Sequence, residues 1–355
     1  MINIIATIVI LLLMLSVIVS IHEFGHFITA KKNGIYVDEF SIGMGPVLLK
    51  HKPKDSETTY CLRVLPIGGF VSMAEKENPE NKKIKKDRVL ENKSFLAKFC
   101  VLIAGIFMNC VLAIFLFFIS GLIYGRPVNE PIINEVVEGK PAQIAGLEKG
   151  DRIIKINGVN VNTFDDFLLE ASAKKIKDNY TIIVEKANKE IKEYNVVPNI
   201  IKQENKDDLR EFGIVFEGTV HYKGFVEALK YGFTGFYDNT ITIFKILGSL
   251  FTGEVSVKNL SGPVGMYSIV DQVKSAGFEM ILYLTAYLSI NVAIINLFPI
   301  PVFDGGRIFI IIIEKIIRRK TNEKLETIIN LVGFGLLILL MLYVTWNDIV
   351  RLVVG

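Results

Sequence analysis

The sequence predicts a polytopic α-helical membrane protein with four transmembrane helices, a re-entrant β-hairpin and one inserted α+β domain. Apolar residues make up 51% of the 355 residues and charged residues 22%, so the two classes must be segregated into membrane and water-facing stretches. Four stretches are apolar over the ~20 residues that a helix needs to cross a bilayer. They lie at about 2–21, 99–123, 280–300 and 328–346.

Basic residues predict the orientation of these helices. Residues 31–98 contain 14 Lys and Arg against 9 Asp and Glu, and residues 305–324 contain 6 against 2. Both segments are therefore expected in the cytosol, and both termini and the 126–220 segment outside. The net charge of +3 is too small to indicate a nucleic-acid partner. None of the three cysteines, Cys61, Cys100 and Cys110, lies in the external segment, so no disulfide framework is expected there.

The chain divides into two membrane regions, 1–125 and 221–355, on either side of an inserted domain at 126–220. Residues 1–125 are expected to hold the first two helices and, at about 40–72, a glycine-rich β-hairpin that dips into the membrane. Backbone that is not helical is tolerated at that depth only beside protein or a polar cavity. Residues 221–355 are expected to hold interfacial helices within 225–253 and then the last two membrane helices.

Residues 126–220 read as a small α+β domain. Strands are expected near 132–137, 153–156, 182–184 and 191–197, with a turn at Asn157-Gly158 and a helix cap formed by Thr163 and Asp166. The run from Gly139 to Val161 resembles a PDZ domain of the kind attached to bacterial proteases, which implies capture of extended peptides. The alternative is that the domain is a folded plug that limits which substrates approach. If it binds peptide ends, the loop that holds the terminal carboxylate of the peptide is expected within 126–134.

The inner end of the first helix carries the sequence HEFGH at 22–26. Residues four apart share a helix face, so His22 and His26 can bind one metal ion, and Glu23 can reach a water on that ion. Such a site suits Zn²⁺, with Glu23 as the catalytic carboxylate. The alternative is that the three side chains only mark where the helix meets the cytosol.

A third ligand must come from elsewhere, because no histidine follows at a suitable spacing. Asp304 is the only carboxylate in 280–313, and Pro299 and Pro301 must unwind the helix just before it. We therefore expect Asp304 to complete the metal site. Asn296 lies at membrane depth and can bind either backbone or a substrate strand.

Several motifs together resemble the site-2 proteases, most closely bacterial zinc metalloproteases of the RseP and RasP type. They are HEFGH at 22–26, FSIGMGP at 40–46, LPIGGF at 65–70, NLSGP at 259–263 and NLFPIPVFDGG at 296–306. The resemblance implies one zinc ion per chain on His22, His26 and Asp304. It also implies that the hairpin, with Gly68 and Gly69, and the segment of Asn296, Pro299 and Pro301 hold the substrate. Asn109 belongs to a Gly-to-Asn motif, with Gly105, that lines the core, and Asn109 is also expected to contact the substrate.

The expected activity is cleavage of peptide bonds within or near the helices of single-span membrane proteins in the bacterial cell membrane. The resemblance implies anti-sigma factors and remnant signal peptides as substrates, with the active site toward the cytosol. The alternative is a non-catalytic PDZ scaffold with a vestigial metal site. A zinc transporter is disfavoured because no inverted repeat is seen.

Overall fold

The computed structural model describes residues 2–74, 84–171, 179–201, 209–216, 219–252, 262–319 and 321–354. The chain forms two compact units, one of Met1–Ser120 with Ala228–Gly355 and the other of Gly121–Glu227. Two sequence motifs fall partly outside the described residues. One is the lysine-rich stretch 75–98, which the sequence predicts to be a solvated or headgroup-facing surface and of which 75–83 are not described. The other is NLSGP, of which 259–261 are not described.

Four helices of the described chain are long and apolar enough to cross a membrane, as predicted. Three of them extend beyond the predicted stretches because polar turns continue the helix at their ends. The third ends at Leu297, before the end of the apolar stretch, because Pro299 cannot donate a helical hydrogen bond. The four helices are α1 (Ile2–Lys32), α2 (Phe95–Ile123), α7 (Phe278–Leu297) and α9 (Glu323–Val354).

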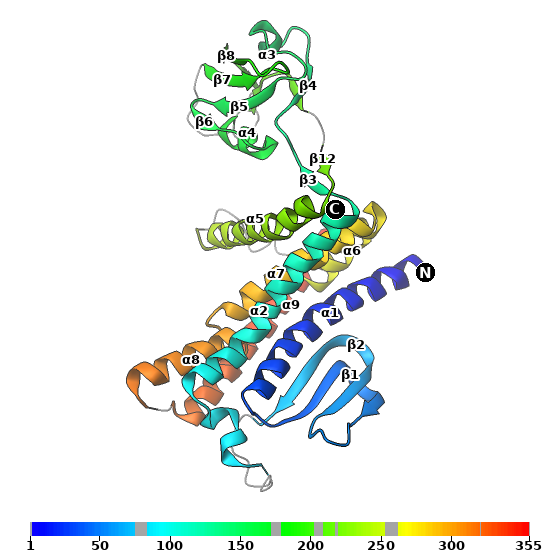
Figure 1. The fold of residues 1–355 in the computed structure, drawn as a ribbon, viewed down its shortest axis with the longest axis vertical. Helices are drawn as coiled ribbons and strands as arrows, with labels where there is room; N and C mark the ends of the chain where they lie inside the picture. The colour runs from blue at the N-terminus through cyan, green and yellow to red at the C-terminus, as the bar shows by residue number, and fades with distance from the viewer. Residues whose placement is uncertain are drawn as a thin grey trace. The chain divides into compact units, whose positions relative to one another are not determined.

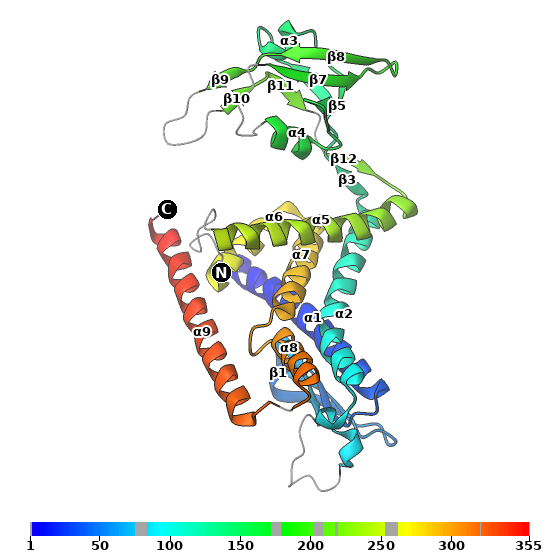
Figure 2. The ribbon, with the colours of Figure 1, turned by 90° about the vertical axis from the view of Figure 1, so that its left-hand side faces the viewer.

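Three further helices belong to the same unit: α5 (Phe225–Thr252), α6 (Pro263–Ala276) and α8 (Asp304–Ile317). Helix α5 is one continuous helix where several were expected, and it buries Tyr231 and Ile243 against α2 and α7. Figure 2 shows α5 running across the ends of these two helices. Helix α6 was not predicted, although Pro263 occupies its first turn, where a missing N–H has no cost.

The expected β-hairpin is present as β1 (Val37–His51) and β2 (Thr59–Met73), which pair antiparallel. Its register is unusual because Phe40 of β1 pairs with Tyr60 on one side and with Val71 on the other. The first half of β1 therefore lies between the two ends of β2. The hairpin lies against the second half of α1 (Figure 1), where β2 makes most of the contact.

A small core joins the hairpin to the end of α1 and the start of α2. Its buried members are Ala30, Ile35, Val37, Leu90 and Val101. Two short 3₁₀ turns, Lys86–Arg88 and Leu90–Asn92, lead into α2.

A cluster of charged side chains lies beside this core. Glu57 accepts two hydrogen bonds of 2.6 Å from the Arg88 guanidinium and one of 3.0 Å from Lys31 Nζ. These bonds, chiefly those from Arg88, lower the pKa of Glu57 to about 2. Glu57 thus joins the loop between the two strands to the end of α1.

The second unit is built on a four-stranded antiparallel sheet in the order β6-β5-β7-β8. Three two-stranded ladders accompany it among the described residues: β4 with β11, β9 with β10, and β3 with β12. The strands are β3 (Arg126–Val128), β4 (Ile133–Val136), β5 (Arg152–Ile156), β6 (Val159–Asn160), β7 (Tyr180–Glu185), β8 (Ile191–Val196), β9 (Asn199–Ile201), β10 (Leu209–Glu211), β11 (Ile214–Phe216) and β12 (Val220–Tyr222).

Local signals in this unit act as predicted. Asn157 and Gly158 both have positive φ, 49° and 84°, which is the geometry of a tight two-residue hairpin turn between β5 and β6. At the start of helix α4 (Phe164–Ala171), Asp166 N–H donates to Thr163 Oγ1 and Thr163 N–H donates to Asp166 Oδ2. This reciprocal cap fixes where α4 begins. A second described helix of this unit is the short α3 (Pro141–Ile144).

Candidate metal centre

His22 and His26 lie one turn apart on the same face of α1, because the helix continues without a break to Lys32. Both side chains are buried, with residue exposures of 7% and 6%. Their Nε2 atoms are 3.1 Å apart and the rings meet edge to face. The two nitrogens therefore point at one common position.

Asp304 reaches this position through a sharp turn after α7. Phe303 N–H donates to Ile300 O, and Val302 in between has φ of 88°. Such a φ favours glycine, and a β-branched residue there is strained by about 1–3 kcal/mol. The turn directs Asp304 into the first position of α8. Asp304 Oδ2 lies 2.9 Å from His22 Nε2 and 3.2 Å from His26 Nε2.

The donor set fits a zinc ion. Two imidazole nitrogens and one carboxylate oxygen, all within 4.8 Å of one another, leave a position open for water. Asp304 Oδ2 is buried and, among the described residues, has no hydrogen bond of acceptable geometry despite its two close neighbours. A cation between the three atoms would satisfy this oxygen and both rings together.

Glu23 lies on the neighbouring face of α1 and is held by the hairpin. Its Oε2 accepts a hydrogen bond of 3.2 Å from the backbone N–H of Val71 in β2. Sequence reasoning missed this contact because a backbone donor leaves no trace in residue type.

Helix α2 packs directly on the two histidines. A Cβ built on Gly105 would lie 2.6 Å from His26 Nε2 and 2.7 Å from His22 Nε2, closer than a carbon atom can approach. The absence of a side chain at this position therefore lets α2 form one wall of the site. The Gly-to-Asn motif was noticed in the sequence, but not this close contact.

The expected substrate-binding residues fall in three places. Gly68 and Gly69 are buried where β2 meets α1, and a Cβ on Gly69 would lie 2.6 Å from Ser41 O. Asn296 is half-buried in the last turn of α7, and Pro299 is exposed in the turn that follows. Pro301 contacts α9, because a Cβ built on Gly333 would lie 2.8 Å from its Cβ.

Asn109 is placed differently from the expectation. Its side chain is fully buried, and its Nδ2 lies 3.5 Å from His22 Nδ1. It thus lies behind a histidine, where it has no exposed surface to offer a substrate.

A cavity of about 490 Å³ opens beside Asp304. Polar side chains on its wall include Arg307 of α8 and Asn330 of α9, and apolar ones include Val302. The cavity gives Asp304 contact with space that water can fill.

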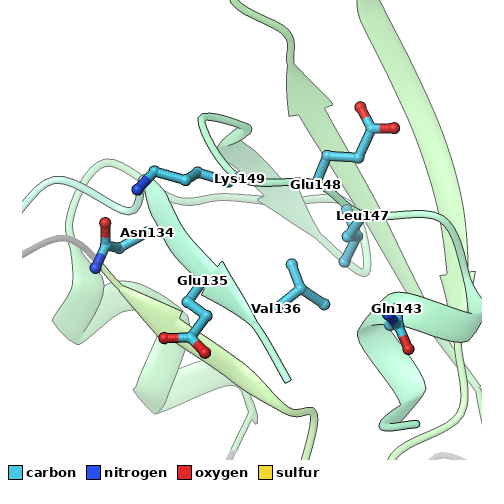
Figure 3. A pocket seen from close by; sticks show the side chains of 7 residues that line it. All are labelled: Asn134, Glu135, Val136, Gln143, Leu147, Glu148 and Lys149. Atoms are coloured by element: carbon cyan, nitrogen blue, oxygen red, sulfur yellow. The ribbon is translucent and has the colours of Figure 1, made fainter. Parts of the chain in front are cut away.

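Two hollows can be followed among the described residues of the inserted unit. The larger, of about 710 Å³, lies between α4 and the segment 210–216, and its walls are largely apolar: Phe164, Phe167, Leu168, Phe212, Ile214 and Phe216. The smaller lies between β4 and α3, and Figure 3 shows Glu135, Glu148 and Lys149 around it. Of the 126–134 segment, Asn129 lines the larger hollow and Asn134 the smaller.

Comparison with known proteins gives one consistent result. Residues 10–340 match the family described as peptidase family M50. A protein of Clostridium perfringens that carries the name zinc metalloprotease is 37% identical over 340 residues, which cover 96% of this chain and 97% of that protein. The regulator of sigma-W protease RasP of Bacillus subtilis is 31% identical over 424 residues, covering 98% and 99%.

Proposed function

Because the chain belongs to peptidase family M50, we propose that it cleaves single-span membrane proteins within or near their transmembrane helices. Membership makes it an intramembrane zinc metalloprotease with several membrane helices. The observation that carries the proposal is the convergence of His22, His26 and Asp304 at one buried point, with Glu23 beside it.

In this proposal His22, His26 and Asp304 hold the zinc ion. When bound, zinc acts as a Lewis acid that lowers the pKa of a coordinated water to about 7. Glu23 takes the proton from the attacking water and returns it to the leaving amine. The Val71 N–H orients the Glu23 carboxylate for these transfers, because it fixes one of the two oxygens.

The substrate must present an extended backbone, because a helix hides its carbonyls in i to i−4 hydrogen bonds. The end of β2 can accept such a backbone as an added strand. Val71 of β2 pairs with Phe40 of β1, but its N–H points away from β1 and donates to Glu23. The edge of β2 that lies away from β1 therefore faces the catalytic carboxylate. Gly68 and Gly69 keep the strand close to α1. Asn296, Pro299 and Pro301 belong to the end of α7 and to the turn that leads into Asp304.

Membrane placement follows from the same features. The exposed apolar side chains of the hairpin, including Ile42, Met44, Leu65 and Ile67, suit a re-entrant loop in lipid. The basic segments support an orientation in which the end of α1 and the α8–α9 connection face the cytosol and the termini and the inserted unit lie outside. Water then reaches Asp304 from the cytosolic side through the cavity lined by Arg307 and Asn330.

The inserted unit is proposed to be a PDZ-like domain that captures extended peptides. The hollow between α4 and β11 supports capture, because among the described strands β11 pairs with β4 alone and the hollow beside it is lined by apolar side chains. Arg210, at the end of this hollow, is a candidate for holding a carboxylate. The relative's name, regulator of sigma-W protease, favours anti-sigma factors as substrates, with remnant signal peptides as a second class.

The test uses the purified full-length protein in detergent, a fluorogenic peptide containing a transmembrane segment, and metal analysis. Glu23→Gln should retain about one zinc per chain and lose cleavage, because the carboxylate moves protons and is not a ligand. His22→Ala should lose both. Glu193→Gln, at an exposed position of β8, is the matched control and should behave as wild type. Cleavage that persists in Glu23→Gln would refute the proposal, and a scaffold would cleave in no form.

A further inference from the structure

Three positions on one face of α2 meet the two histidines. Val101, Gly105 and Asn109 are spaced four residues apart, so they lie in a row along the helix. Gly105 faces the space between the rings, as described above. The two flanking positions each offer a polar group to the far nitrogen of one ring.

His26 is held by the backbone of Val101. Its Nδ1 lies 2.7 Å from Val101 O, and because a carbonyl only accepts, Nδ1 must carry the proton. The Nε2 lone pair is then free, and it points toward Asp304. The tautomer of His26 is therefore set for metal binding by a helix backbone, whichever side chain stands at position 101.

His22 has the same requirement and a different partner. Its Nε2 also faces Asp304, so a metal ligand at Nε2 requires the proton on Nδ1 and an acceptor beside it. The polar group there is the Asn109 amide, whose Nδ2 is 3.5 Å away, while its buried Oδ1 has no hydrogen-bond partner in the part of the chain that the structure describes. If the Asn109 amide is turned by 180°, its Oδ1 takes the place of Nδ2 and accepts a hydrogen bond from His22 Nδ1–H. Asn109 Oδ1 then has a donor and His22 Nδ1 has an acceptor.

The Asn109 backbone is also fixed. Ser289 of α7, itself fully buried, donates a hydrogen bond of 2.9 Å to Asn109 O. The amide is therefore presented to His22 by two packed helices and does not depend on a loop.

We propose that Asn109 is a positioning residue that accepts the Nδ1 proton of His22 and so keeps Nε2 aimed at the metal. This inference rests on the proposed metal site. Acceptors behind ligating histidines fix ring orientation, and their loss typically lowers metal affinity about 10–100-fold.

The experiment measures zinc affinity by competition with a chromophoric chelator, and ligand geometry from the visible absorption of the cobalt-loaded protein. Asn109→Leu removes the acceptor at nearly constant volume and should lower zinc affinity about 10–100-fold and change the cobalt spectrum. Asn109→Asp keeps an acceptor oxygen and should retain affinity within a few-fold. Ser120→Ala is the matched control, because Ser120 is a buried polar residue of the same helix far from the site.

Wild-type affinity and spectrum in Asn109→Leu would overturn the inference. If that variant does not fold, Asn109→Ala and Asn109→Asp decide, since equal losses in both would show that the acceptor oxygen is irrelevant. His22→Ala separates this inference from the proposed function. Unchanged zinc binding in that variant would refute the metal site, whereas loss in His22→Ala with none in Asn109→Leu refutes only the role of Asn109.

Discussion

Replacement of Gly105 by alanine tests whether the close packing of α2 sets the geometry of the metal site. The added Cβ would lie 2.6 Å from His26 Nε2, against about 3.5 Å for an ordinary contact, so ring and helix must separate by about 0.9 Å. Displacements of about 1 Å at reacting groups cost about 100-fold in rate, equivalent to about 2.7 kcal/mol. We expect Gly105→Ala to lower turnover about 100-fold and zinc affinity at least about tenfold.

The effect should appear without loss of fold, because alanine is favoured over glycine within a helix by about 0.5–1 kcal/mol. Cleavage of a transmembrane peptide, zinc affinity and thermal unfolding in detergent are measured together. Gly335→Ala in α9 is the matched control, since nothing lies within 4 Å of a Cβ at that position. Wild-type turnover and zinc affinity in Gly105→Ala would refute the inference that α2 forms a wall of the site.

Four further outcomes are expected. Chelation of the metal should abolish cleavage, and added Zn²⁺ but not Mg²⁺ should restore it, because imidazole ligands favour zinc; recovery with Mg²⁺ would contradict the donor set. The depressed pKa of Glu57, about 2 against the usual 4.5, stabilises the fold above pH 4.5, and this stabilisation is lost as pH falls toward 2. Glu57→Gln should therefore lower the free energy of unfolding by about 1–2 kcal/mol at pH 7 and by much less near pH 3. If the unfolding midpoints of Glu57→Gln and wild type differ by the same amount at both pH values, the ion cluster does not stabilise the fold as argued. Asp348 Oδ2 accepts from Gly265 N–H in the first turn of α6, so Asp348→Ala should destabilise by about 1–2 kcal/mol in chemical unfolding, with Asp348→Asn closer to wild type. Thr163→Ala should cost about 1 kcal/mol through loss of the α4 cap, detectable as faster proteolysis of the inserted unit, whereas equal proteolysis would show that the cap is dispensable.

Elements with a strong local signal were predictable from the sequence. The membrane helices follow from apolar length, the end of α7 from Pro299, and the β5–β6 turn from Asn157-Gly158. The pairing of His22 with His26 also follows from spacing alone, because a helix places residues four apart on one face. Asp304 was identified by elimination, since it is the only carboxylate in its stretch.

Other features had no local signal. Helix α6 was missed because its sequence is neither long and apolar nor preceded by a side-chain cap, and the cap from Asp348 comes from more than 80 residues away. Asn109 was expected to contact the substrate, but its side chain is buried behind His22. This burial depends on how α2 packs against α1, which the sequence does not reveal. The larger hollow of the inserted unit is walled mainly by 210–216, with Asn129 from the 126–134 segment, because β11 returns from the end of the domain to pair with β4.

The sequence by itself determined which residues can perform the chemistry, since residue type and helical spacing are local properties. The tertiary structure decided how those residues are held. The Val101 carbonyl and the Val71 N–H belong to the backbone, so the residue types at these positions do not reveal them. The glycine at 105 is visible in the sequence, but its need for space becomes apparent only when α2 packs on the two histidines. Only the packing of helices and strands distant in the sequence brings such groups within hydrogen-bonding distance of a side chain.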